Sequence, residues 1–159
     1  MFILAFMVPV FFSFAWLLFF SFGVLFALDY FILFMIANRP KASRKVAYRL
    51  SNGDKNTVEL IIRNRNRFSI SIKIIDELPI QLQERNFHLN KKFAAGEQKT
   101  IHYTLQPAER GTYSFGNIIL FVQSFAGLVV RRFTIPAAQT VHVYPSYMQM
   151  RKYQLLSKS

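Results

Sequence analysis

The sequence VELIIRNRNRFSISIKI, from Val58 to Ile74, decides the fold of this chain. Apolar residues recur at every second position in both halves of this stretch, which is the pattern of β-strands with one buried face. Between the halves, Arg63 to Arg67 carries two Asn residues and predicts a turn. The stretch therefore predicts two strands of a β domain, joined as a hairpin.

Further strand-like runs continue toward the carboxyl terminus, and no helical period competes with them. The runs cover residues 87–93, 100–105, 112–115, 117–124, 128–135 and 140–144. Gly53, Gly96 and Gly127 mark turns between predicted strands. About eight short strands without an intervening helix predict an all-β fold, an immunoglobulin-like antiparallel β-sandwich in residues 38–145.

Residues 1–37 form a separate apolar region in front of the β domain. Asp29 is its only formal charge, and all 20 Lys and Arg residues follow it. The run exceeds the roughly 20 apolar residues that span a bilayer, and it is far longer than the apolar part of a cleaved signal peptide. We therefore expect an N-terminal transmembrane helix, with one full span at about 11–36 and a truncated first helix at 1–8.

The positive charge that follows this segment predicts how the protein is oriented. Five basic residues and no acid come directly after it: Arg39, Lys41, Arg44, Lys45 and Arg49. The positive-inside rule then places the β domain on the cytoplasmic side. Asp29, Arg39, Lys41, Arg44 and Lys45 are expected at the membrane interface. Asp29 has two interpretations, namely an anchor paired with Arg39 or a headgroup, and a polar contact with another membrane helix.

The sequence contains no recognisable catalytic or metal-binding constellation. Cysteine is absent, and His88, His102 and His142 stand between apolar neighbours on predicted strands, so that they should face solvent. Asp76 and Glu77 point to opposite faces of an extended chain and cannot act together as acid and base. Neither a nucleophile elbow nor a phosphate-binding loop occurs. We expect no enzyme, no metal and no cofactor.

The formal charge of +12 raises the possibility of a polyanionic partner. Beyond the juxtamembrane cluster, however, the basic residues are spread over several strands and do not form a stripe with interleaved aromatic residues. The densest group, Arg63, Arg65 and Arg67, is expected to be a solvated turn, with contact to anionic lipid as the alternative. A lipid bilayer is therefore the expected partner, and nucleic acid is not.

Several phrases of the sequence resemble the bacterial family called domain of unknown function 58. They are RLSNGD at 49–54, IDELP at 75–79, QER at 83–85, LQP at 105–107, RGTYSFG at 110–116, VYPS at 143–146 and MRKY at 150–153. The resemblance implies an inner-membrane protein, often encoded beside MoxR-type AAA+ ATPases, in which an immunoglobulin-like region precedes a von Willebrand A-like domain. Residues 146–159 would lead to that domain, which is expected to be missing here.

Four residues of these motifs are candidate structural or interaction residues: Arg110, Gly111, Tyr113 and Gly116. The two glycines permit turn geometries that other residues avoid, and Tyr113 resembles the tyrosine that closes a corner of immunoglobulin sandwiches. Arg110 is expected to cap this turn. The alternative is a partner-docking surface formed by Arg110 and its loop.

Together these features predict a membrane-anchored scaffold or interaction protein of the bacterial inner membrane. Its β domain would position a downstream A-like module, a MoxR-type ATPase or another membrane protein at the cytoplasmic face. The alternative prediction is a ligand-binding β-sandwich that faces the periplasm.

Overall fold

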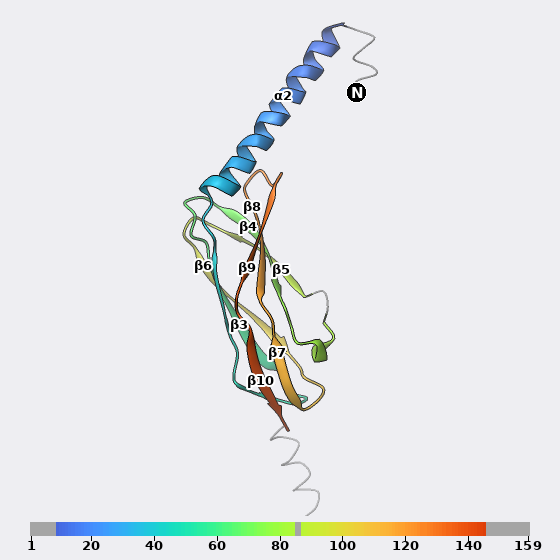
Figure 1. Cartoon of the computed structure of the whole chain (residues 1–159), viewed down its shortest axis with the longest axis vertical. Coiled ribbons are helices and arrows are strands. Elements are labelled where there is room, and N and C mark those ends of the chain that lie inside the picture. The colour runs from blue at the N-terminus through green and yellow to red at the C-terminus, as the bar shows by residue number, and fades with distance from the viewer. Residues whose placement is uncertain (1–8, 85–86, 146–159) are drawn as a thin grey trace, which may run out of the picture.

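The computed structural model describes residues 9–84 and 87–145, and it shows one long helix joined to an elongated β domain (Figure 1). Helix α2 spans Pro9–Phe31 and continues into a short π-helix, η1, at Ile32–Ile36. By length and composition, Phe12–Ile36 is a candidate membrane span, and only 11% of its apolar window is buried. A helix this exposed and this apolar is not a core helix of the domain. The expected helix at 1–8 and the tail at 146–159 lie outside the described residues.

The β domain is an immunoglobulin-like antiparallel β-sandwich, as predicted, and ten strands are present in the described ranges. They are β1 (Lys41–Lys45), β2 (Arg49–Ser51), β3 (Asn56–Arg63), β4 (Ile70–Asp76), β5 (His88–Phe93), β6 (Gln98–Leu105), β7 (Gly111–Phe115), β8 (Ile118–Gln123), β9 (Val130–Ile135) and β10 (Gln139–Tyr144). The short strands β1 and β2 were not predicted, because their charged and polar residues lack a clear apolar alternation.

The strands form sheets with the orders β1-β3-β6, β5-β4-β8-β9 and β2-β10-β7. Strand β8 pairs with β9, and β7 pairs with β10, so that residues 111–144 form one long hairpin. Only Gly116 and Asn117 separate β7 from β8. Because of this break, the two halves of the hairpin belong to different sheets. The β8–β9 half, near α2, pairs with β4, whereas the β7–β10 half, far from α2, pairs with β2. The hairpin therefore runs along the length of the domain (Figure 1).

The predicted hairpin between β3 and β4 is wrong. Strand β3 pairs with β1 and β6, whereas β4 pairs with β5 and β8 in the other layer. The intervening loop is an arch that crosses from one layer to the other. Buried Asn64 stabilises it, because its side-chain amide donates to the carbonyl of Phe68 at 2.9 Å and to that of Ala94 at 2.8 Å. These bonds tie the arch to the β5–β6 turn.

The two layers enclose one apolar core. Its inward-facing residues include the alternating positions predicted from the sequence: Val58, Leu60 and Ile62 on β3, and Ile70, Ile72 and Ile74 on β4. Leu33 of η1 is fully buried in the same cluster. The end of the long helix is therefore part of the core of the β domain.

Candidate functional site

Asp29 fastens α2 to the loop between β8 and β9. Its carboxylate is buried, and its Oδ2 atom accepts hydrogen bonds from the backbone N–H groups of Leu128 and Val129, both at 2.9 Å. The hydroxyl of Ser124 donates to Oδ1. The expected pairing with Arg39 is therefore wrong, because the partners of Asp29 lie in its own β domain, 95 to 100 residues later. Charge-assisted bonds of this kind are stronger than neutral ones. The position of Asp29 at the membrane interface and its contact with another membrane helix stay predictions.

Arg131 holds the end of the helix from the neighbouring strand, β9. Its Nη1 atom donates to the carbonyls of Leu33 at 2.9 Å and Phe34 at 3.2 Å. Such terminal carbonyls lack partners within a helix. The guanidinium also lies over the rings of Phe34 and Phe133, at 5.0 and 4.7 Å from their centroids. The same residue thus provides both polar and apolar contacts at the junction.

Two polar contacts fix the linker that follows the helix. The backbone N–H of Asn38 donates to the side-chain oxygen of Asn66 at 2.5 Å, and Asn66 in turn donates from its backbone to Asn64 at 2.9 Å. Arg39 donates to the carbonyl of Thr134. Helix, linker and β domain are therefore joined without a free hinge between them.

The expected interface position of Arg44 is wrong. Its side chain is 1% exposed and forms an ion pair with Asp76, which is fully buried. Arg44 also donates to the carbonyl of Ala137 at 2.8 Å and to that of Gly116 at 3.1 Å, at the break in the long hairpin. In the sequence Arg44 looks like one more juxtamembrane cation, because its acidic partner is 32 residues away. Lys41 and Lys45 are exposed on β1, and their interface role stays a prediction.

Tyr103 completes this buried polar cluster. Its hydroxyl donates to Asp76 at 2.5 Å. Burial of the ring, followed by the negative charge of Asp76, raises the pKa of Tyr103 far above its ordinary value. Arg44 on β1 and Tyr103 on β6 thus reach across the core to Asp76 on β4. Because all its charged groups are enclosed, the cluster joins the layers and offers no access to a substrate.

The motif around Tyr113 has the predicted corner, but two of its neighbours differ from expectation. The Tyr113 hydroxyl donates to the carbonyl of Glu109 at 2.9 Å, which confirms the tyrosine corner. Gly111 has a positive φ of 141°, as a turn glycine would. Gly116 instead allows close approach, because a Cβ atom there would lie 2.8 Å from Cβ of Glu77. Arg110 is exposed and forms no hydrogen bond with the described residues, so the capping role is wrong.

The outer face of the β2-β10-β7 sheet carries an aromatic and basic ladder that the sequence did not reveal. His142 lies between two tyrosines, with ring centroids 5.2 Å from Tyr48 and 6.4 Å from Tyr144. Arg49 lies over the Tyr144 ring at 5.6 Å. Tyr48 is 61% exposed and Tyr144 is 47% exposed. His142, between them, is less exposed and is half-buried. We call these four residues the distal ladder, because they lie on or beside β2 and the last residues of β10, and β10 finishes at the end of the domain far from α2 (Figure 1).

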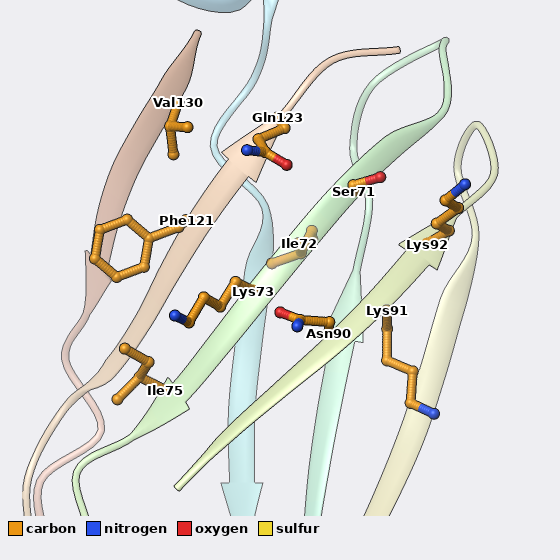
Figure 2. A pocket seen from close by; sticks show the side chains of 10 residues that line it. All are labelled: Ser71, Ile72, Lys73, Ile75, Asn90, Lys91, Lys92, Phe121, Gln123 and Val130. Atoms are coloured by element: carbon orange, nitrogen blue, oxygen red, sulfur yellow. The ribbon is translucent and has the colours of Figure 1, made fainter. Parts of the chain in front are cut away.

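Two of the hollows on the surface of the described residues bear on function. One, of about 550 Å³, lies on the β5-β4-β8-β9 sheet, where Ile75 and Phe121 are flanked by Lys73 (Figure 2). The other, of about 520 Å³, borders the linker and contains four basic residues and no acid: Arg39, Lys41, Arg63 and Arg65. Within the described ranges, no three His, Asp or Glu side chains group as metal ligands would.

No protein family model and no curated protein matches this sequence. Among solved structures, the CARDB domain of a Pyrococcus furiosus protein is 13% identical, with a TM-score of 0.47, over 68% of this chain and 90% of that one. The PapD-like domain of human CEP192 is 9% identical, with a TM-score of 0.44, over 67% and 87%. A β-glucosidase from Listeria innocua is 16% identical, with a TM-score of 0.38, over 69% of this chain and 16% of the enzyme. These likenesses concern the fold alone.

Proposed function

We propose that this protein is a non-catalytic, membrane-anchored scaffold that holds a partner at a fixed distance and orientation from the bilayer. The junction between α2 and the β domain carries the proposal. Three parts of the domain hold the helix end and its linker: the β8–β9 loop binds Asp29 of the helix, Arg131 on β9 binds the last carbonyls, and Asn66 on the β3–β4 arch binds the linker. A tether that only retains a domain at a membrane needs no such contacts, and a flexible linker would serve. A rigid junction transmits the orientation of the helix to the domain.

The path of the chain supports the role of a spacer. Helix α2 enters the domain at one end, and β10 finishes at the opposite end (Figure 1). At about 3.3 Å per residue, the segment from Val130 to Tyr144 covers up to roughly 45 Å. Whatever follows Tyr144 or binds beside it is held at that distance from the helix end. On the family resemblance, the partner is an A-like module or a MoxR-type ATPase at the cytoplasmic face of a bacterial inner membrane.

The distal ladder is the surface that we assign to the partner. Tyr and Arg are enriched among the residues that dominate binding energy at protein interfaces, because they combine large contact area with hydrogen-bonding groups. Here Tyr48 and Tyr144 are exposed next to the point where the described chain ends. Arg110 belongs to the same end, since Gly111 lies opposite Val143 in the β7–β10 pairing. Its guanidinium is exposed and has no ion pair or hydrogen bond among the described residues, and we assign it to the partner surface.

Recovery of partners from membranes tests this assignment. The tagged full chain and a Tyr48→Ala, Tyr144→Ala double variant would be purified from membranes under the same conditions. Ile80→Ala is a matched control, because Ile80 is a 90% exposed apolar residue outside the ladder, on η2 (Ile80–Leu82), which contacts the β7 edge of the same sheet through Gln81. We expect the double variant to lose a MoxR-type ATPase or A-like protein that the control retains. Equal recovery in all three would contradict the ladder as the binding surface.

A topology reporter separates the scaffold from the alternative, a periplasm-facing ligand-binding module. Arg39 and Lys41 are exposed close to the helix end, and this favours a cytoplasmic domain. Reporters fused after Ser159 should therefore be active only in the cytoplasm. Activity in the periplasm would contradict the scaffold and favour the alternative, with the hollow at Phe121 as its binding site (Figure 2).

A further inference from the structure

The tip of the β8–β9 hairpin exposes apolar side chains beside the helix. Phe125 is 83% exposed, and Leu128 and Val130 are 39% and 45% exposed. Exposed apolar residues that stand singly need no explanation, whereas a cluster of them indicates a surface that something covers. Figure 1 shows this tip rising beside the lower turns of α2.

The depth of this tip along the helix is set by Asp29. Because Asp29 binds the backbone of Leu128 and Val129, the tip lies level with Asp29. Asp29 precedes Ile36, the last residue of η1, by seven positions. At 1.5 Å per residue, the tip therefore reaches about 10 Å up the helix from its end.

The helix itself indicates where the hydrocarbon of the bilayer ends. The part of α2 before Asp29 is the apolar segment 9–28, and its length at 1.5 Å per residue is about 30 Å, the thickness of a bilayer core. The part after Asp29 packs one side against the β domain, where Leu33 is fully buried, whereas Phe31, Met35 and Ile36 are more than half exposed. The hydrocarbon thus extends at least to the level of Asp29, where the apolar tip lies, and the exposed apolar residues after Asp29 let it extend further toward Ile36.

Basic side chains surround this end of the domain. Arg65 and Arg67 are exposed on the β3–β4 arch, which Asn66 ties to the linker at Asn38. Arg65 also lines the basic hollow described above, beside Arg39 and Lys41. These cations therefore gather at the end of the domain that joins the helix. Anionic headgroups attract such juxtamembrane arginines.

We propose that the 124–129 tip inserts into the interfacial layer of the bilayer, with Phe125 and Leu128 among the acyl chains and Arg65 and Arg67 on anionic headgroups. The domain then rests on the membrane as well as being tethered to it. Insertion of an apolar tip with basic flanks follows the same physics as interfacial helices. This inference depends on the membrane-spanning role of α2 and explains how the scaffold keeps its orientation to the bilayer.

The absence of cysteine makes site-specific depth measurements straightforward. Single variants Ala126→Cys, Ile80→Cys and Val24→Cys would each carry an environment-sensitive fluorophore in the full chain. The vesicles would contain phosphatidylcholine and phosphatidylglycerol, with doxyl-labelled lipid as quencher. Ala126 is exposed at the tip and leaves Phe125 intact, whereas exposed Ile80 lies far from it. We expect quenching at positions 24 and 126 and none at 80.

A second set of variants tests the forces involved. Adding Phe125→Asp to the Ala126→Cys chain should lower the quenching at position 126 to the level seen at position 80. Omitting phosphatidylglycerol from the vesicles should lower the quenching at position 126 only in part. Quenching at Val24 but not at Ala126 would overturn tip insertion and leave the scaffold proposal intact. Absence of quenching at Val24 as well would overturn the membrane role on which both depend.

Discussion

Replacing Asp29 with Ala should release the helix from the β domain without unfolding either part. The substitution leaves the N–H groups of Leu128 and Val129 and the hydroxyl of Ser124 without their shared acceptor. Hydrogen bonds to a charged group contribute about 1.5–3 kcal/mol each when buried. Because Leu128 is 39% exposed, water can form some of the hydrogen bonds that the variant loses. We therefore expect a loss of about 3 kcal/mol in the free energy of opening the junction.

Hydrogen exchange measures this opening directly. A loss of about 3 kcal/mol corresponds to roughly 150-fold faster exchange, since every 1.4 kcal/mol is tenfold. We expect this acceleration at the amides of Leu128 and Val129 in the full chain in lipid nanodiscs. The amide of Gly53, bonded to Pro107 at the far end, should be unchanged. Glu59→Ala removes a half-exposed carboxylate on β3 and serves as the matched control.

Asp29 does not hold the junction if both junction amides exchange less than about fivefold faster in Asp29→Ala, which corresponds to under 1 kcal/mol. The local role of Asp29 is also contradicted if Glu59→Ala accelerates exchange at the junction amides equally. The effect would then follow from the loss of any carboxylate and not from the loss of these hydrogen bonds. A fall in protection at Gly53 equal to that at Leu128 would mean global unfolding and would contradict a local role.

Three further predictions concern the core. Asp76→Asn should lower the free energy of unfolding by about 3–5 kcal/mol, because Arg44 is left buried with an uncompensated charge; a midpoint in guanidinium equal to that of the parent would contradict this. Below about pH 10 the Tyr103 hydroxyl is neutral in the folded and in the unfolded protein. Above about pH 10 it ionises first in the unfolded protein, because folding raises the pKa of Tyr103. Stability should therefore fall as pH rises above about 10, and less steeply in Tyr103→Phe; equal slopes in alkaline unfolding curves would exclude this. Gly116→Ala should cost about 1–3 kcal/mol through its clash with the Glu77 side chain, and thermal unfolding should show recovery when Glu77→Gly, which removes the clashing Cβ atom, is added; no recovery would assign the cost elsewhere.

Much of the fold was predictable because the relevant signals are local. The period-two pattern of Val58 to Ile74 reports which residues face inward wherever the strand is placed. The tyrosine corner was predictable for the same reason, since Tyr113 bonds a carbonyl four residues earlier. The alternation does not show which strand pairs with which, and the β3–β4 arch was therefore predicted as a hairpin.

The sequence by itself determined that an apolar, nearly uncharged helix precedes a β-sandwich, because hydropathy and alternation depend on solvent preference residue by residue. Only the tertiary structure decided what Asp29 and Arg44 do. Their partners lie 95 and 32 residues away, and no local pattern encodes a contact at that separation. A charge placed near a membrane helix looks the same in sequence whether it meets water, lipid or a buried ion of opposite sign, and the folded chain alone selects among them.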